Sequence, residues 1–217
     1  MIMQYIKSLI IKLPQYSLDE ARTRYSFLSI IIMFIIYSFF GWVWEVCLHF
    51  FIDGMFVNRG VLRGPWLPIY GTGGILSLLA LRRFIDRPLL LFFLAMLLCT
   101  VLEYVTGWFL LTHLGYRWWD YSSDYVLQLH GHISLLAALF FGVACLSGVY
   151  IISPALNKRL GKLSYTVKII VCAVLLLLFV VDTSLSIWNP NMPAGIMPAD
   201  KGKTHVISQA RFDKGTH

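Results

Sequence analysis

Two glutamates interrupt long apolar stretches of this 217-residue sequence, and their placement indicates chemistry in a nonpolar environment. Glu45 lies in the apolar segment 27–51, and Glu103 lies in the segment 88–111. A charged side chain at the centre of a membrane-spanning helix costs about 2.5–3.5 kcal/mol, so each glutamate needs a partner or a task. We predict that both face the interior of a helix bundle, because small and polar residues share their helical stripes. These residues are Phe34, Ser38, Gly41 and His49 in the first segment, and Thr100, Tyr104 and Gly107 in the second.

Arg59 and Arg63 are the predicted partners of the two carboxylates. They are the two arginines of the Gly- and Pro-rich stretch 58–71, which follows the first apolar segment. Gly60 and Gly64 lie beside them and allow the backbone to fold tightly, which can bring a guanidinium close to a helix end. We therefore expect both glutamates and both arginines to share one pocket at the non-cytoplasmic ends of the helices.

A second polar and aromatic group follows the segment that contains Glu103. The run from Arg117 to Tyr121 contains Trp118, Trp119 and Asp120. Tryptophans are common anchors at membrane interfaces, and this alternative stays open for both. The neighbouring Arg117 and Asp120 favour a rim over the bundle. The candidate polar site as a whole comprises Glu45, Asn58, Arg59, Arg63, Tyr70, Glu103, Tyr104, Trp119, Asp120 and His130, while Asp182 is expected near the outer interface or in the cluster.

The histidines raise the question of a metal site. His130 and His132 precede the fourth apolar segment, and with His49 and the glutamates they offer imidazole and carboxylate ligands. No HExxH or comparable spacing supports such a site. We favour neutral, hydrogen-bonded histidines, and expect no metal and no cofactor.

Composition defines the class of protein. Hydrophobic residues make up 58% of the sequence and charged residues 13%, against about 25% charged in an ordinary globular chain. A soluble fold of this size cannot hide so much apolar surface, so lipid must be its main solvent. The net charge of +7 comes from short clusters beside apolar runs, which is typical of membrane orientation signals and excludes nucleic acid as the expected partner. The four cysteines form no CxxC pair and are expected to be apolar core residues.

The elements that position these residues are predicted to be helices. We expect an all-α, polytopic membrane bundle over residues 17–188, opened by a capping box at Ser17–Glu20. An amphipathic segment, 1–16, is predicted to lie on the membrane surface, and the polar tail 189–217 to be disordered or loosely attached. The second span is short for a 30 Å hydrocarbon core, so we expect it to begin irregularly or to re-enter. The five predicted spans are 27–51, 68–81, 88–111, 133–152 and 167–188.

The distribution of lysine and arginine predicts the orientation. With the N-terminus in the cytoplasm, eleven basic residues flank the spans on that side, and three lie in the opposite loops. Five spans then place the C-terminus outside. The cytoplasmic set is Lys7, Lys12, Arg22, Arg24, Arg82, Arg83, Arg87, Lys158, Arg159, Lys162 and Lys168.

An ordered series of motifs lies between residues 34 and 134. The motifs are Tyr37–Trp42, Glu45, Asn58–Gly60, Gly64–Pro65, Pro68–Gly71, Leu102–Tyr104, Gly107 and Trp118–Tyr121. This series resembles the bacterial membrane family described as putative ABC-transporter type IV, or CmpB-like, and the resemblance implies a permease-like component of the bacterial plasma membrane. Where the family pattern has Asn-x-x-Gly before the fourth span, this chain has His130-Gly-His132.

Three functions are compatible with these observations. The first is a transport protein whose polar site opens to the non-cytoplasmic side. An ATP-driven version needs a separate ATPase subunit, because the chain contains no phosphate-binding loop, and the best docking surface is 153–166. The second is a membrane-embedded enzyme acting on a lipid or lipid-linked substrate, with the arginines binding a phosphate. The third is a structural or sensory protein. Membrane lipids are expected partners, and a homo-oligomer is compatible with the sequence.

Overall fold

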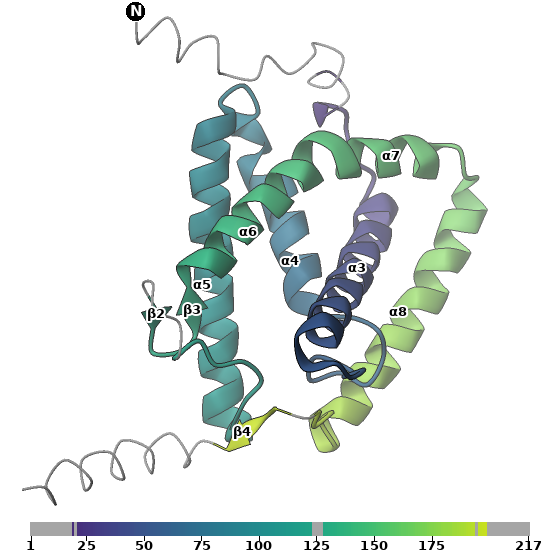
Figure 1. The fold of residues 1–217 in the computed structure, drawn as a ribbon. Coiled ribbons are helices and arrows are strands. Elements are labelled where there is room, and N and C mark those ends of the chain that lie inside the picture. Colours follow the sequence, from purple (N-terminus) through teal and green to yellow (C-terminus); the bar gives the residue numbers. More distant parts are fainter. Residues whose placement is uncertain (1–18, 20, 123–127, 194, 199–217) are drawn as a thin grey trace, which may run out of the picture.

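The computed structural model describes residues 19, 21–122, 128–193 and 195–198, and these form an all-α bundle (Figure 1). The fold class predicted from composition is therefore confirmed. The predicted surface helix 1–16, nearly all of the Ser17–Glu20 capping box and residues 199–217 lie outside the described residues. The main helices are α3 (Phe27–Asp53), α4 (Pro68–Leu76), α5 (Pro88–Leu114), α6 (Leu135–Ser147), α7 (Ser153–Gly161) and α8 (Tyr165–Trp188).

Four helical segments of the described chain are long and apolar enough to cross a membrane. They start close to the predicted positions, and the chain is an integral membrane protein. The third of them differs from the prediction, because α6 continues through the π-helical turn η3 (Gly148–Ile152) into α7. The four segments are Phe27–Ile52, Pro88–Leu114, Leu135–Gly161 and Tyr165–Trp188.

The predicted second span is too short to be one of these four segments. It consists of α4, the π-helical turn η1 (Ser77–Leu81) and the 3-10 turn η2 (Arg82–Phe84). Figure 1 shows it returning the chain from the far end of α3 to the start of α5. The sequence predicts an irregular start for this span, but the structure has the irregular turns at its end. The start is regular because Pro68 occupies the first helical turn, where proline is compatible with an α-helix.

Glycines let α3 and α4 pack closely, and this contact fixes the site described below. A Cβ added at Gly71 would clash with Ser38 and with the backbone of Phe34 on α3. In the same way, the Tyr70 ring of α4 occupies the space above Gly41 of α3. Ser38 is fully buried, and its carbonyl accepts the Leu67 backbone N–H at 2.9 Å just before α4 begins. The small residues on the predicted stripe of α3 therefore serve close helix packing.

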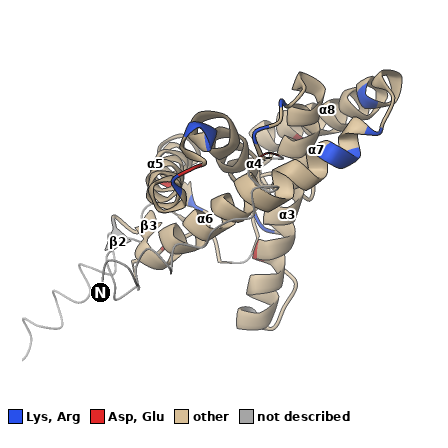
Figure 2. Ribbon diagram, turned by 90° about the horizontal axis from the view of Figure 1, so that it is seen from above, with Lys and Arg blue, Asp and Glu red and all other residues tan. Residues whose placement is uncertain are grey.

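Several basic residues lie at the end of the bundle where Figure 1 shows α7, and Figure 2 views the bundle from above with Lys and Arg in blue. Arg22 pairs with Asp86 at 2.5 Å, and Arg82 donates to the carbonyl oxygens of Arg22 and Thr23. Asn157 of α7 donates to the Arg24 carbonyl at 3.2 Å. We call this region the basic end; residues from the start of α3, η2 and α7 meet there, although they are far apart in the sequence.

At the opposite end, two short strand pairs order the loops. Strand β1 (Tyr116–Arg117) pairs antiparallel with β4 (Met197–Pro198), and β2 (Gln128–Leu129) pairs with β3 (Ile133–Ser134). The first part of the predicted loose tail is thus held against the bundle. Asn191 adds to this attachment, because its backbone N–H donates to the Val61 carbonyl at 2.8 Å.

Candidate functional site

Glu45 of α3 receives contacts from three elements. The Tyr70 hydroxyl of α4 donates to Glu45 Oε1 at 2.5 Å. The Arg59 Nε and His49 Nε2 atoms lie 3.7 Å and 3.9 Å from Glu45 Oε2. The Glu45 side chain is 22% exposed and the Arg59 side chain 11%, so both charges are largely removed from solvent. A helix, a second helix and a loop therefore converge on this carboxylate.

Glu103 of α5 is more deeply buried, at 3% exposure. The Tyr121 hydroxyl donates to Glu103 Oε1 at 2.9 Å, whereas Oε2 accepts no hydrogen bond from any described residue. Both carboxylates interact electrostatically with each other and with the Tyr70 hydroxyl. We call Glu45, Arg59, Tyr70, Glu103 and Tyr121 the carboxylate cluster.

Arg59 reaches the cluster from the loop between α3 and α4. One of its terminal nitrogens donates to the Trp118 carbonyl at 3.2 Å, which connects this loop with the loop after α5. Its Nε lies near Glu45 but has no hydrogen bond with a described residue. The cluster thus contains one donor without a hydrogen bond, Arg59 Nε, which is ion-paired with Glu45, and one acceptor without a hydrogen bond, Glu103 Oε2. Each such buried group costs about 1–3 kcal/mol when nothing binds it.

Arg63 lies elsewhere, and here the structure differs from the predicted pairing with the glutamates. Its Nε donates to the Asn189 carbonyl at 3.2 Å, and its backbone N–H donates to Asp182 Oδ1 at 3.2 Å. Asp182 of α8 also accepts from the Gly64 backbone and the Trp66 indole, at 2.9 and 2.6 Å. Because these three donors turn the loop toward α8, the Arg63 side chain points away from the cluster. Asp182 is therefore the anchor of this loop.

Asn58 is the second fixed point of the loop. Its side-chain oxygen accepts the Trp42 indole N–H at 2.7 Å, and its amide donates to the Arg63 carbonyl at 2.9 Å. The Asn191 amide donates to the carbonyls of Asn58 and Gly60, at 2.8 and 3.0 Å. Asn58 thus shapes the backbone that carries Arg59 and does not contact the cluster itself.

The remaining predicted residues form a rim over α5. Arg117 lies 3.6 Å from Asp120 and donates to the His130 carbonyl at 3.0 Å. The Trp119 indole donates to the His132 carbonyl at 3.1 Å. The Tyr104 ring lies near both histidine rings, with centroids 6.4 Å from that of His130 and 5.7 Å from that of His132. Trp118 is 3% exposed and donates to the Asn191 carbonyl, so it is a buried part of the loop contact and not a lipid-facing anchor.

His132 is held over Gly107 of α5, where an added Cβ would lie 2.7 Å from its Nδ1 atom. Burial, followed by the positive charge of Arg117, lowers the pKa of His132 below its usual 6.5, so the ring is neutral at pH 7. Across the described residues, no group of three or more His, Cys, Asp or Glu side chains is close enough to hold a metal ion.

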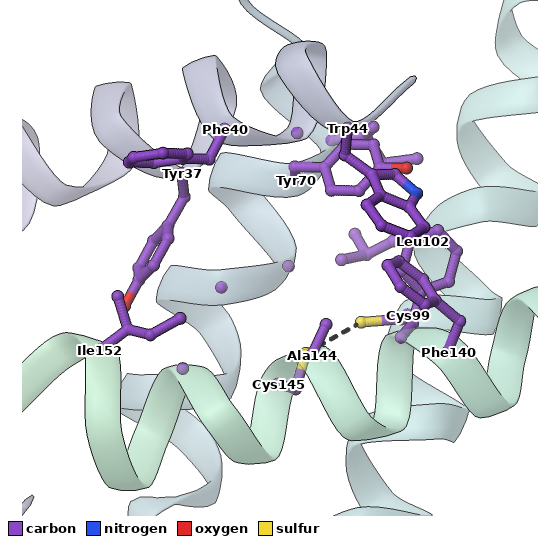
Figure 3. Close-up of a pocket in the computed structure, with 16 residues that line it drawn as sticks. Tyr37, Phe40, Trp44, Tyr70, Cys99, Leu102, Phe140, Ala144, Cys145 and Ile152 are labelled. Carbon is purple, nitrogen blue, oxygen red and sulfur yellow. Dashed lines mark hydrogen bonds between the residues drawn. The ribbon is translucent and has the colours of Figure 1, made fainter. Parts of the chain in front are cut away.

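An apolar cavity of about 320 Å³ adjoins the cluster between α3, α4, α5 and α6 (Figure 3). The Tyr70 ring lines this cavity, while its hydroxyl group bonds Glu45. Cys99 lines it from α5, one helical turn before Glu103, and its Sγ lies 3.5 Å from that of Cys145 on α6. Sequence reasoning missed both the cavity and the contact of Tyr121 with Glu103, since neither follows from a local pattern.

These features define a polytopic helical membrane protein with a buried carboxylate cluster beside an apolar cavity. A sequence model of the family described as putative ABC-transporter type IV matches residues 32–187, and the chain belongs to this family. The matched region contains every residue of the cluster. No curated protein and no solved structure matches the chain.

Proposed function

We propose that this chain is the membrane-embedded component of a transport system and that the carboxylate cluster binds its substrate. Its family and its apolar helices support a role in membrane transport. The observation that carries the site is Glu103 Oε2, a buried acceptor without a hydrogen bond from any described residue, close to the Glu45–Arg59 ion pair. Inside a bundle such an acceptor is costly, so a ligand that donates a hydrogen bond to it would gain the free energy that it forfeits when empty.

We also propose that the cluster opens to the non-cytoplasmic side. The basic end, which holds Arg22, Arg82 and Lys158, is at the opposite end of the helices, and positive residues favour the cytoplasmic side. The N-terminus would then be cytoplasmic and the C-terminus outside. Fusing alkaline phosphatase to the C-terminus checks this orientation, since the enzyme is active only outside the cytoplasm; an inactive but full-length fusion would contradict it.

ATP-driven transport requires a separate ATPase subunit. The surface that supports such docking is α7 at the basic end, where Pro154 begins the helix and Lys158 and Arg159 occupy its last turn. Affinity purification in mild detergent should recover an ATPase with the chain, and replacing both basic residues with glutamate should reduce the recovery. Purification of the intact chain without any ATPase would remove the ATP-driven version.

Glu103→Gln tests the substrate site. A strain lacking the chain would be complemented with the wild type, Glu103→Gln or Asp86→Asn, and small-molecule and lipid profiles compared across the membrane. Asp86 is a matched control because it is exposed at the basic end. We expect the wild type and Asp86→Asn to restore the profile and Glu103→Gln to fail at equal membrane abundance. Full restoration by Glu103→Gln would refute the proposal, and new lipid structures, instead of a changed distribution, would favour the membrane-embedded enzyme.

A further inference from the structure

We infer that the substrate is an amphiphile with an ammonium headgroup, which binds the carboxylate cluster, and a hydrocarbon chain, which fills the apolar cavity. The two sites are joined by Tyr70, whose ring lines the cavity and whose hydroxyl bonds Glu45. They are joined again on α5, where Cys99 and Leu102 line the cavity and the next residue is Glu103. The cavity and the carboxylate cluster therefore share Tyr70 and adjoin each other along α5.

The lining of the cavity is almost entirely apolar. The Trp44 ring of α3 stacks on the Phe140 ring of α6, with centroids 4.6 Å apart and planes 16° apart, at the end near the cluster. At the other end, the Tyr37 hydroxyl and Ser153 Oγ are 2.5 Å apart. Its volume of about 320 Å³ lies within the range of small-molecule sites. A hydrocarbon chain suits this apolar lining.

The mouth of the cavity faces lipid. The most exposed lining side chains are Phe40 and Trp44 on α3, at 60% and 44%, and Ile152 at the end of η3, at 41%. Ala144 of α6 is also exposed at this wall. All four residues lie in the middle of membrane-spanning segments. An amphiphile in the bilayer can therefore enter sideways between α3 and α6 without crossing water.

The charge of the cluster indicates the headgroup. The cluster contains two carboxylates and one guanidinium, which leaves one negative charge in excess when both carboxylates are ionised. Glu103 Oε2, buried and without a described partner, is an acceptor that an ammonium N–H can satisfy. Glu45 lies eight residues before the end of α3, so the headgroup would sit about 12 Å inside that end. The hydrocarbon chain of the ligand would then point toward the basic end. In the proposed orientation, this is the direction of the acyl chains in the outer leaflet.

This inference rests on the proposed function in so far as the bound amphiphile is called the substrate. The experiment therefore measures binding alone. Proteoliposomes of neutral phosphatidylcholine would receive a long-chain primary alkylamine carrying a photoreactive diazirine and an alkyne, or the matched carboxylic acid. Labelled peptides would be identified by mass spectrometry. The variants are Ala144→Phe, which fills the cavity, Glu103→Gln, and Val143→Phe as the matched control, because Val143 is 57% exposed and lies outside the cavity.

We expect the amine to label the cavity segment of α6 in the wild type and in Val143→Phe, and the signal to fall severalfold in Ala144→Phe. Glu103→Gln should keep chain labelling but lower the preference for amine over acid about tenfold, as loss of one charge-assisted hydrogen bond implies. Equal labelling of the Ala144 and Val143 variants, or a wild type without amine preference, would overturn the inference. Specific binding without transport would refute the proposed function and leave this inference intact.

Discussion

Asp182 offers the sharpest test of how the site is held together. Its carboxylate accepts three hydrogen bonds from one loop, at 3.2, 2.9 and 2.6 Å. Hydrogen bonds to charged groups contribute about 1.5–3 kcal/mol each, and the loop is partly exposed, so we take the lower value for each. Asp182→Ala should then lower the free energy of unfolding by about 4.5 kcal/mol. Asp182→Asn keeps one acceptor oxygen but loses the charge, and should cost about 2 kcal/mol.

Unfolding of the purified protein in mixed micelles, titrated with dodecyl sulfate and followed by tryptophan fluorescence, measures both variants. Asp86→Asn is the control, because its pair with Arg22 is 61% and 49% exposed and such surface pairs contribute about 0–1 kcal/mol. The expected order of stability is wild type, Asp86→Asn, Asp182→Asn and Asp182→Ala. An Asp182→Ala variant as stable as Asp86→Asn would refute the reasoning that this carboxylate anchors the loop.

Three further substitutions test the contacts around the cluster. Gly107→Ala should destabilise the folded protein by about 1–3 kcal/mol, because the added Cβ would lie 2.7 Å from His132 Nδ1. Gly161→Ala, where no atom lies within 4 Å of the added Cβ, should leave the stability unchanged, and thermal unfolding in detergent compares the two variants. The pKa of His132 is lower in the folded protein than in the unfolded chain, so the unfolded chain binds the proton more readily. The stability that the neutral His132 contributes is therefore present above about pH 6.5 and is lost as the pH falls through the lower pKa of the folded state. In a pH series of unfolding titrations, His132→Gln should reduce this loss of stability at acid pH. Tyr70→Phe should lower the amine preference in the photolabelling assay, while Tyr150→Phe, which removes a hydroxyl bonded to the Ile85 carbonyl at the basic end, should leave it unchanged.

Most helices could be located from the sequence because lipid demands long apolar runs. The expected segments 27–51 and 88–111 correspond to α3 and α5, which extend two and three residues further. The fourth segment is predicted to end near residue 152, just before Pro154. In the structure, Pro154 lies in the first turn of α7, where its missing N–H is not needed after the η3 turn. A local pattern could not show that this proline continues the helix.

The direction of the glutamates and the proximity of Arg59 to Glu45 also followed from the sequence, but the position of Arg63 did not. Glu103 points inward because Gly107 lies one turn further along the same face of α5, where His132 packs. By contrast, Arg63 and Asp182 are 119 residues apart, and their contact depends on how α8 closes the bundle. The sequence also contains no indication that Asn191 binds the loop carbonyls, since an asparagine in a polar tail resembles any loop residue.

The shortness of the second span explains why the polar site is recessed into the bundle. Residues 68–84 rise about 25 Å at 1.5 Å per residue, against about 40 Å for the 27 residues of α3. Because the Tyr70 ring packs on Gly41, α4 begins beside the middle of α3, and the rest of α3 extends beyond it. The loop between the two helices fills that space and carries Arg59 down to the depth of Glu45. A second span of full length would cover Glu45 with an apolar helix and exclude the guanidinium, so the irregular span is the feature that creates the charged site beside the cavity.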